Sequence, residues 1–207
     1  MSDTTENQIE IVLIRHGKTE GNKQKQYIGR TDQPLSEEGK AEIRSGSYPG
    51  VEKVYASPML RTRQTAALIY PEQTIELVEG LREMDFGVFE GKSHAQLKHR
   101  PSYVLWIAAR GKLKIPQGES MKKFSERTLD GFLQVVQNMQ KEGIKKAAVV
   151  AHGGTIMAIT AQLTGDDYYS HMVNNGGGYR MYMDAAGKLI SMQPLLGKDN
   201  EMQERPS

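Results

Sequence analysis

Two histidines and two arginines of this 207-residue chain each follow closely behind a short apolar run. They are Arg15, His16, Arg61 and His152. A guanidinium group pairs with two oxygens of a phosphate, and a histidine can attack phosphorus if its attacking nitrogen carries no proton. Nearby arginines favour that state, because positive charge lowers the pKa of an imidazole. The four residues therefore predict a site that binds a phosphoryl group, with His16 as the nucleophile.

The leaving group of such a reaction needs a proton from a positioned acid. We assign this role to Glu83 in the segment LREMDFG, because a bound phosphate disfavours the ionised carboxyl and raises its pKa. Asp85 and Glu90 lie close by in the sequence and stay open as alternatives. Since arginines can balance the charge of the phosphoryl group, we expect neither a metal ion nor a cofactor.

Short runs of apolar, largely β-branched residues predict the strands that position these groups. They cover residues 9–14, 53–56 and 147–151, with a weaker candidate at 74–78. In an open α/β sheet, ligands bind beyond the carboxyl ends of the strands, where loops lead into helices. The residues that follow three of these runs are therefore expected to meet in one cleft.

Helical patterns separate the strands. Ser57-Pro58 resembles an N-cap followed by proline at the first helical position, and another helix is expected from about Thr155 to the residue before Gly165. The long helix between them has one apolar face, made of Met121, Phe124, Thr128, Phe132, Val135 and Met139. With a hairpin at 179–183 and 189–192, this order predicts a three-layer α/β fold whose mixed, mostly parallel sheet is flanked by helices.

Composition narrows the classes of function. The net charge of +2 gives no reason to expect binding to nucleic acid or to an anionic membrane. Without cysteine, the chain has no disulfide, thiolate metal site or cysteine nucleophile. The first eight residues are polar and no apolar stretch could span a bilayer, which predicts a cytoplasmic protein. We expect one domain over 1–207, with a core at 9–193, a flap over the site at 84–120 and a loose tail at 197–207.

Six segments resemble the histidine phosphatase superfamily, which includes the phosphoglycerate mutases. The family signature of Arg-His-Gly followed by Thr and Asn matches RHGKTEGN. The other segments are YIGRTDQPLSEEG, YASPMLRTRQTAALI, LREMDFGVFEG, PQGESMKKFSER and VVAHGGTIMAI, and they occur in the expected order. The resemblance implies a phosphoglycerate mutase-like fold, with His16 as the phosphorylated residue and Glu83 as acid and base. It also implies that Arg15, Arg61 and His152 surround the phosphate.

Three further positions match the substrate side of the family pattern: Asn22, Gly29 and Gly153. In that pattern the backbone N–H of Gly153 faces the phosphate. Each position also has an ordinary structural explanation. Asn22 could cap a helix or close a turn, and the two glycines could serve only to adopt positive φ angles.

Within the superfamily, the chain is most similar to compact bacterial α-ribazole-5′-phosphate phosphatases, in its length and in GRTDQPLS and FGVFEGKSHAQL. Gly153-Gly154 stands where similar mutases have Gly-Asn, and their middle insertion is missing. We therefore predict a phosphomonoesterase for a small phosphorylated metabolite, with α-ribazole 5′-phosphate as a candidate substrate. A phosphoglycerate mutase-type transferase and a non-catalytic module that binds phosphorylated ligands are the alternatives. A pure binder has no need of an acid, which counts against the module, and the oligomeric state stays open.

Aromatic and basic residues alternate between residues 92 and 117. They are Tyr103, Trp106, Arg110, Lys112 and Lys114. They could stack on and hold a nucleotide-like substrate, or Trp106 could anchor a core while the basic side chains are solvated. Both interpretations stay open. We assign His94, His99 and His171 to the surface or to the rim of the substrate site.

Overall fold

A computed structural model describes residues 8–184 and 186–195. The predicted tail at 197–207 lies outside the described residues. The strands are β1 (Ile9–Arg15), β2 (Lys53–Ala56), β3 (Ile75–Leu77), β4 (Lys146–Ala151), β5 (Gly178–Met183) and β6 (Leu189–Pro194). The helices are α1 (Glu20–Lys23), α2 (Glu37–Ser45), α3 (Leu60–Ile69), α4 (His94–Leu97), α5 (Pro101–Ala108), α6 (Met121–Glu142) and α7 (Gly153–Thr164). Short 3₁₀ helices are η1 (Glu79–Leu81), η2 (Gly87–Phe89) and η3 (Tyr168–His171).

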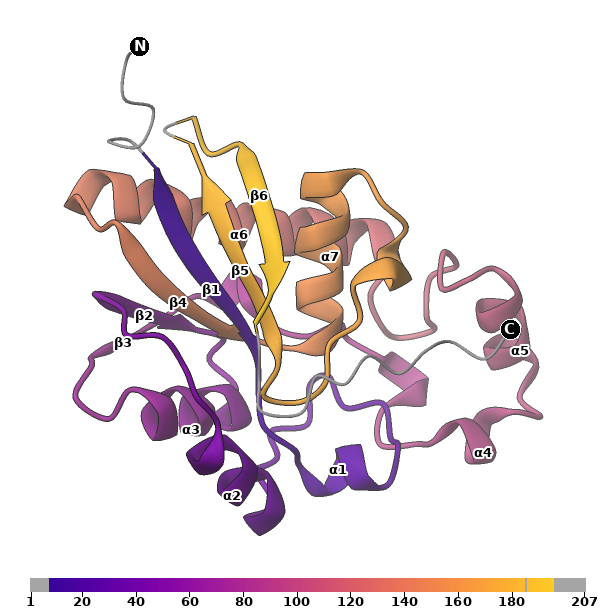
Figure 1. The fold of residues 1–207 in the computed structure, drawn as a ribbon. Helices are drawn as coiled ribbons and strands as arrows, with labels where there is room; N and C mark the ends of the chain where they lie inside the picture. The colour runs from indigo at the N-terminus through magenta and orange to yellow at the C-terminus, as the bar shows by residue number, and fades with distance from the viewer. Residues whose placement is uncertain (1–7, 185, 196–207) are drawn as a thin grey trace.

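One sheet with the strand order β3-β2-β4-β1-β5-β6 forms the middle layer of the fold (Figure 1). The first four of these strands run parallel, and β5 and β6 continue the sheet in antiparallel fashion, which confirms the predicted mixed sheet. Strands β1 and β4 end in register, with Arg15 opposite Ala151, and β2 ends beside them. His16, Ser57 and His152 are the next residues along these strands and therefore meet at one edge.

Both faces of the central strands are buried, because their alternate residues are apolar on each side. In β1, Ile11 and Leu13 pack in the cluster that includes residues of α6 and α7. Val12 and Ile14 pack in the cluster that includes residues of α3. Figure 1 shows α2 and α3 on one face of the sheet and α6 and α7 on the other, which is the predicted three-layer arrangement.

The two helices α6 and α7 follow the predicted patterns closely. The apolar face of α6 is buried, apart from the partly buried Met121. Helix α7 begins at Gly153, two residues before the predicted Thr155. It ends at Thr164, because Gly165 takes a left-handed conformation with a φ of 80° that favours glycine.

The predicted start of α3 is wrong by two residues. The N-cap position is Met59 instead of Ser57, and Met59 makes no capping hydrogen bond. The N–H of Leu60 instead donates to Oδ1 of Asp32 at 2.6 Å. Ser57 is fully buried, and its hydroxyl is hydrogen-bonded to His152. The Asp32 carboxylate, which comes from a distant loop, caps α3 in place of Ser57. The Ser57 hydroxyl is therefore able to bond to His152.

Residues 84–120 form their own small hydrophobic cluster beside the sheet. Its members include Phe89, Leu97, Tyr103 and Trp106, and Phe124 of α6 joins them. Tyr103 is 1% exposed and Trp106 is 6% exposed, so the interpretation of Trp106 as a core anchor is confirmed. The side chains at positions 112 and 114 are exposed, as that interpretation expects. In the described part of the chain, no helix combines the length and apolar character that a membrane span requires.

We expect Asp32→Ala to lower the free energy of unfolding by about 1 kcal/mol, because the first turn of α3 loses its capping acceptor. Asp32→Asn keeps an acceptor oxygen and should lose less than half as much. Urea denaturation followed by circular dichroism measures both variants. If Asp32→Ala is as stable as the wild type, the remote cap does not stabilise α3.

Candidate active site

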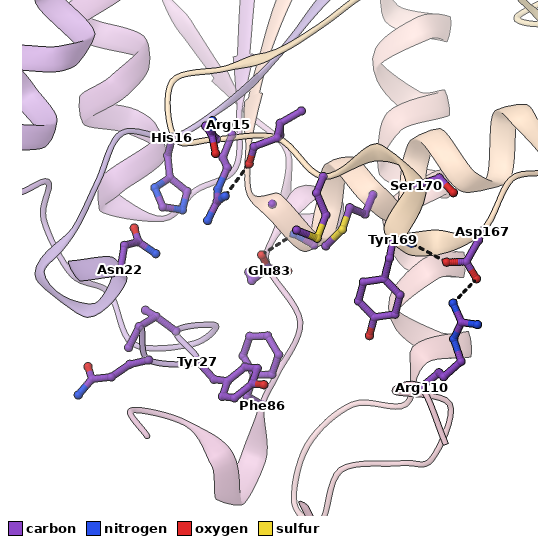
Figure 2. A pocket seen from close by; sticks show the side chains of 18 residues that line it. Arg15, His16, Asn22, Tyr27, Glu83, Phe86, Arg110, Asp167, Tyr169 and Ser170 are labelled. Carbon is purple, nitrogen blue, oxygen red and sulfur yellow. Dashed lines mark hydrogen bonds and ion pairs between the residues drawn. The ribbon is translucent and has the colours of Figure 1, made fainter. Parts of the chain in front are cut away.

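A cavity of about 1040 Å³ opens at the carboxyl edge of the sheet. Of the predicted site residues, Arg15, His16, Asn22, Glu83 and Gly153 line it. Figure 2 shows His16, Arg15 and Asn22 pointing into one space, with Glu83 beyond them. The remaining predicted residues do not belong to its wall and lie behind it.

His16 is held in one tautomer. Its Nδ1 lies 2.7 Å from the carbonyl oxygen of Gly17, which can only accept, so Nδ1 carries the proton and Nε2 has a free lone pair. The side chain is 5% exposed. Burial, followed by the charges of Arg61 and Arg15, lowers the pKa of His16 well below its ordinary value of 6.5. The imidazole is therefore neutral at neutral pH, as the sequence predicted.

His152 packs edge-on against His16, with ring centroids 5.2 Å apart. Its Nδ1 accepts a hydrogen bond from Nε of Arg61 at 3.2 Å, because a guanidinium can only donate. The proton is then on Nε2, which donates to Oγ of Ser57 at 2.8 Å. Burial and the charge of Arg61 lower the pKa of His152 well below 6.5. Both ring nitrogens of His152 are thus engaged by protein groups.

Arg61 is 1% exposed and connects the second histidine to a loop. Its guanidinium donates to the carbonyl oxygens of Thr31 at 2.9 Å, Gly29 at 3.0 Å and Ile28 at 3.4 Å. The side chain is therefore used mainly to hold residues 28–31 in place. Its positive charge still acts on both imidazoles, which lie beside it.

Arg15 crosses the N-terminus of α7, where it faces the cavity. One of its nitrogens donates to the carbonyl oxygen of Val173 at 2.6 Å. Its Nε is buried and has no hydrogen-bond partner among the described residues. A Cβ at Gly153 would lie 3.2 Å from the guanidinium carbon, so glycine gives Arg15 room there. An unpaired N–H beside the positive end of a helix is suited to an anion.

Glu83 is fixed across the cavity by two backbone donors. The N–H of Met84 donates to Oε1 at 2.8 Å and that of Gly154 to Oε2 at 3.0 Å. Burial raises the pKa of Glu83, although these hydrogen bonds and the nearby arginines oppose the rise. A Cβ at Gly154 would overlap with Oε1 and come within 3.0 Å of the Tyr168 hydroxyl. These close contacts explain why the second residue of the pair Gly153-Gly154 is glycine.

The two alternative carboxylates are engaged elsewhere. Asp85 accepts from the N–H of Gly87 and pairs with Arg30. Glu90 accepts from the N–H groups of Gly29 at 2.9 Å and Thr31 at 3.0 Å. Neither lines the cavity that His16 faces. The geometry therefore favours Glu83 among the three.

The predicted substrate-side residues divide into two groups. Asn22 both lines the cavity and accepts from the N–H of Thr19 at 3.0 Å, which completes the capping box of α1. Gly29 lies behind the wall, and there a Cβ would overlap with the carbonyl oxygen of Met84. Neither Gly29 nor Gly153 has a positive φ, so that explanation of the two glycines is wrong. Close packing is the reason for both.

An apolar extension of about 410 Å³ adjoins the cavity and shares part of its wall. Its lining includes Tyr27, Phe86, Trp106, Met157, Tyr168 and Tyr169. At the rim, Arg110 pairs with Asp167 at 3.1 Å, as Figure 2 shows. The cavity therefore has a cationic end at Arg15 and an aromatic lobe on the side of residues 84–120.

The remaining histidines lie away from the cavity. His94 is hydrogen-bonded to the Tyr103 hydroxyl at 2.9 Å, and His171 is paired with Asp166 at 2.8 Å. Over residues 8–184 and 186–195, no group of three or more His, Asp or Glu side chains is placed to hold a metal ion.

Sequence reasoning did not identify Ser57, Gly154 or Tyr168 as part of the site. Ser57 directly follows β2 at the edge where the two histidines were expected, so its position was a usable signal. Gly154 was noticed only as a departure from the mutase pattern. The approach of Tyr168 to Glu83 depends on how η3 packs on α7 and has no local signal.

The chain resembles known proteins in sequence and in fold. Residues 11–186 match the family described as histidine phosphatase superfamily (branch 1). The chain is 31% identical to a metal-independent phosphoserine phosphatase of Arabidopsis thaliana, over 75% of this chain and 68% of that protein. It is 32% identical to a 2,3-bisphosphoglycerate-dependent phosphoglycerate mutase of Rhizobium etli, over 72% and 77%. The structure of an α-ribazole phosphatase from Shigella flexneri has the same fold, with a TM-score of 0.72 and 24% identity over 85% of this chain and 90% of that one.

Buried neutral histidines make the stability depend on pH. An imidazole of the unfolded chain titrates near pH 6.5, whereas the pKa of His16 and that of His152 are well below this value in the native protein. Between these values only the unfolded chain binds the proton. Their contribution is therefore fully present above about pH 6.5 and is lost as the pH falls below it.

His16→Asn removes one of these groups. We expect the loss of unfolding free energy between pH 7 and pH 5.5 to shrink by about 1 kcal/mol relative to the wild type. Urea denaturation at the two pH values measures it. His99→Asn changes an exposed histidine and is the matched control, which should leave the loss unchanged. A loss in His16→Asn equal to that of the wild type would contradict a neutral His16.

Proposed function

Because the chain belongs to the histidine phosphatase superfamily, we propose that it is a phosphomonoesterase that acts through a phosphohistidine at His16. One observation carries the proposal. The Nδ1 of His16 is committed to Gly17, and its ring faces a cavity shared by Arg15 and Glu83. A ring held in this tautomer presents the lone pair of Nε2 to a bound phosphate without first losing a proton.

In the first step, the Nε2 lone pair of His16 forms a bond to phosphorus while the bond from phosphorus to the ester oxygen breaks. Glu83 gives its proton to that oxygen and becomes a carboxylate. Burial favours the protonated acid before the step, because it raises the pKa of Glu83. The Nδ1–H bond to the Gly17 carbonyl stabilises the positive charge that the ring gains.

In the second step, the Glu83 carboxylate takes a proton from water, and the water oxygen attacks phosphorus. The bond between phosphorus and Nε2 breaks, and its electron pair returns to His16. Inorganic phosphate leaves, and both side chains regain their starting states. One carboxyl thus serves as acid and then as base.

Arg15 and the N–H of Gly153 at the start of α7 are the direct phosphate donors in this proposal. Arg15 lines the cavity, and its Nε has no hydrogen-bond partner among the described residues. Arg61 and His152 lie behind His16 and act on the reaction by holding it neutral and fixed. Asn22 faces the same space and can donate its side-chain amide to substrate.

We further propose that the reaction needs no metal ion, because Arg15 and the α7 N-terminus already supply positive charge at the phosphate, with the charge of Arg61 behind His16. A relative at 31% identity is named a metal-independent phosphoserine phosphatase, which supports the same expectation.

The aromatic lobe favours a substrate whose alcohol part carries a planar or apolar group. Tyr27 and Phe86 have ring centroids 5.1 Å apart, and Tyr27 and Trp106 are 5.9 Å apart, so the lobe has rigid aromatic walls. Such walls suit a ring system better than the short polar chains of phosphoserine or phosphoglycerate. Among the candidates, α-ribazole 5′-phosphate meets this requirement. A structural neighbour from Shigella flexneri bears the name α-ribazole phosphatase.

A phosphoglycerate mutase is the second candidate, since a relative at 32% identity bears that name. The large cavity speaks for hydrolysis, because a mutase must shield its phosphohistidine from water. A module that only binds phosphorylated ligands would not need the acid Glu83. Both alternatives remain outcomes of the experiments below.

The first experiment measures phosphate release in the presence of EDTA, with α-ribazole 5′-phosphate, phosphoserine, nucleotides and phosphoglycerates as substrates. We expect α-ribazole 5′-phosphate to be the best substrate. The variant His16→Ala should lose about 10³-fold or more of the rate of phosphate release. His99→Ala is the matched control and should keep the wild-type rate. Release that survives in His16→Ala, or that requires added magnesium, would contradict the mechanism. Interconversion of phosphoglycerates faster than phosphate release would identify a mutase.

The second experiment tests the acid. Glu83→Gln should slow hydrolysis of an alkyl phosphate by about 10²-fold or more, but that of p-nitrophenyl phosphate by less than tenfold, because p-nitrophenolate leaves without a proton. Glu90→Gln is the comparison variant, and any loss it causes should be the same for both esters. A loss of equal size for both esters in Glu83→Gln would refute the acid role.

A further inference from the structure

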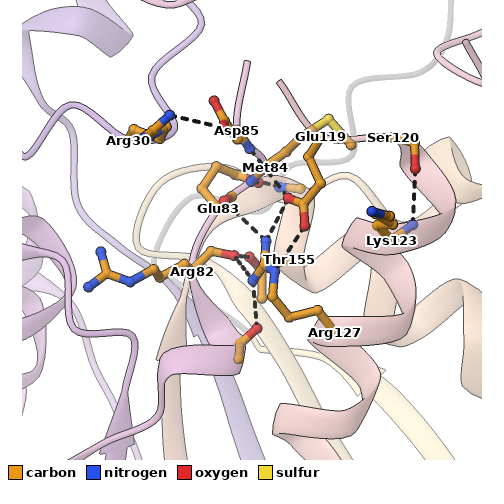
Figure 3. Close-up of polar contacts among 12 residues, drawn as sticks. Arg30, Arg82, Glu83, Met84, Asp85, Glu119, Ser120, Lys123, Arg127 and Thr155 are labelled. Carbon is orange, nitrogen blue, oxygen red and sulfur yellow. Dashed lines mark hydrogen bonds and ion pairs between the residues drawn. The ribbon is translucent and has the colours of Figure 1, made fainter. Parts of the chain in front are cut away.

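Arg127 of α6 holds the segment of backbone that carries Glu83 (Figure 3). One terminal nitrogen donates to the carbonyl oxygens of Gly80 at 2.9 Å and Arg82 at 3.1 Å. The other donates to the carbonyl oxygen of Glu83 itself at 3.4 Å. Three carbonyl groups at and before the proposed acid are therefore fixed by one guanidinium.

Glu119 completes this contact from the other side of the guanidinium. Its carboxylate accepts from Nε of Arg127 at 3.0 Å and from a terminal nitrogen at 2.8 Å. The same carboxylate accepts from the N–H of Asp85 at 3.4 Å, and the N–H of Glu119 donates to the carbonyl oxygen of Asp85 at 2.9 Å. The pair of Arg127 and Glu119 thus binds the chain on both sides of Glu83.

The segment needs such support because it has no regular structure of its own. Helix η1 ends at Leu81 and η2 begins at Gly87, so residues 82–86 take part in no helix or strand. Thr155 of α7 adds hydrogen bonds from its hydroxyl to the carbonyl oxygens of Leu81 and Arg82, both at 3.3 Å. Helices α6 and α7 together therefore fix a loop that would otherwise have free carbonyl groups.

We propose that Arg127 is a positioning residue for the phosphatase reaction, which holds the carboxyl of Glu83 where it can protonate the leaving group. The inference rests on the proposed acid role of Glu83. Lysine cannot replace this function, because a single ammonium group cannot donate to three carbonyl groups and pair bidentately with a carboxylate. Positioning matters strongly here, since proton transfer requires hydrogen-bond distance to the ester oxygen.

A merely structural role for Arg127 makes a different prediction. The side chain also packs against the ring of Phe124, with its guanidinium carbon 5.4 Å from the ring centroid. Loss of that packing would lower the stability and would reduce turnover of every ester by the same factor. A positioning role reduces turnover only where the leaving group needs a proton.

The test measures kcat and KM of Arg127→Lys for an alkyl phosphate and for p-nitrophenyl phosphate. We expect kcat for the alkyl ester to fall by about tenfold or more. For p-nitrophenyl phosphate kcat should fall by less than about threefold, and KM should stay within about twofold of the wild type. Lys123→Ala changes an exposed side chain at the N-terminal end of the same helix and is the matched control. Glu119→Gln weakens the contact between Arg127 and Glu119 and should shift the ratio of the two kcat values in the same direction. This variant replaces Arg127→Lys in the test if Arg127→Lys does not fold.

The double variant Arg127→Lys/Glu83→Gln separates this inference from the proposed function. If Arg127 acts through Glu83, the ratio of kcat for the alkyl phosphate to kcat for p-nitrophenyl phosphate is no lower in the double variant than in Glu83→Gln alone. Equal losses for both esters in Arg127→Lys, or additive losses in the double variant, would overturn the inference and leave the acid role intact. If Glu83→Gln itself does not separate the two esters, the acid role fails and the inference fails with it.

Discussion

The buried guanidinium of Arg61 is the constraint on which the site depends. A charge in a protein interior is tolerated only when its N–H groups are matched, because leaving it unpaired costs several kcal/mol. Here the partners are the carbonyl groups of residues 28–31 and Nδ1 of His152. This arrangement fixes the tautomer of His152 and places a positive charge beside His16. The N–H groups of Gly29 and Thr31 in the same loop donate to Glu90, so a second side chain also fixes this loop.

The N-terminus of α7 brings the Arg15 guanidinium and the Glu83 carboxyl together without a clash. Gly153 gives room to the guanidinium of Arg15, and Gly154 gives room to the carboxylate of Glu83. A Cβ at Gly154 would overlap with Oε1 of Glu83, and a Cβ at Gly153 would be in tight contact with the Arg15 guanidinium. Burial raises the pKa of Glu83 even though Arg61 and Arg15 lie near, so the acid stays protonated more readily than an exposed carboxyl. A phosphoryl group between them would meet a donor of positive charge on one side and a proton donor on the other.

The two ends of the cavity come from different parts of the chain. The edge of the sheet supplies Arg15, His16 and His152, whose positions follow from strand register, and α3 supplies Arg61. The segment 84–120 supplies the aromatic wall, and it rests on its own small hydrophobic cluster.

The sequence by itself determined the strands of a mixed sheet, the helices α3, α6 and α7, and the edge where Arg15, His16 and His152 gather. These features follow from local hydrophobic patterns and from the rule that ligands bind at the carboxyl ends of parallel strands. Only the tertiary structure decided which contacts complete the site. Asp32 caps α3 in place of Ser57, Arg61 turns to loop carbonyls, Trp106 enters a core, and Glu83 rather than Glu90 faces the cavity. These outcomes depend on hydrogen bonds and packing between residues far apart in the chain. A local pattern holds no information about which distant partner will satisfy a buried polar group.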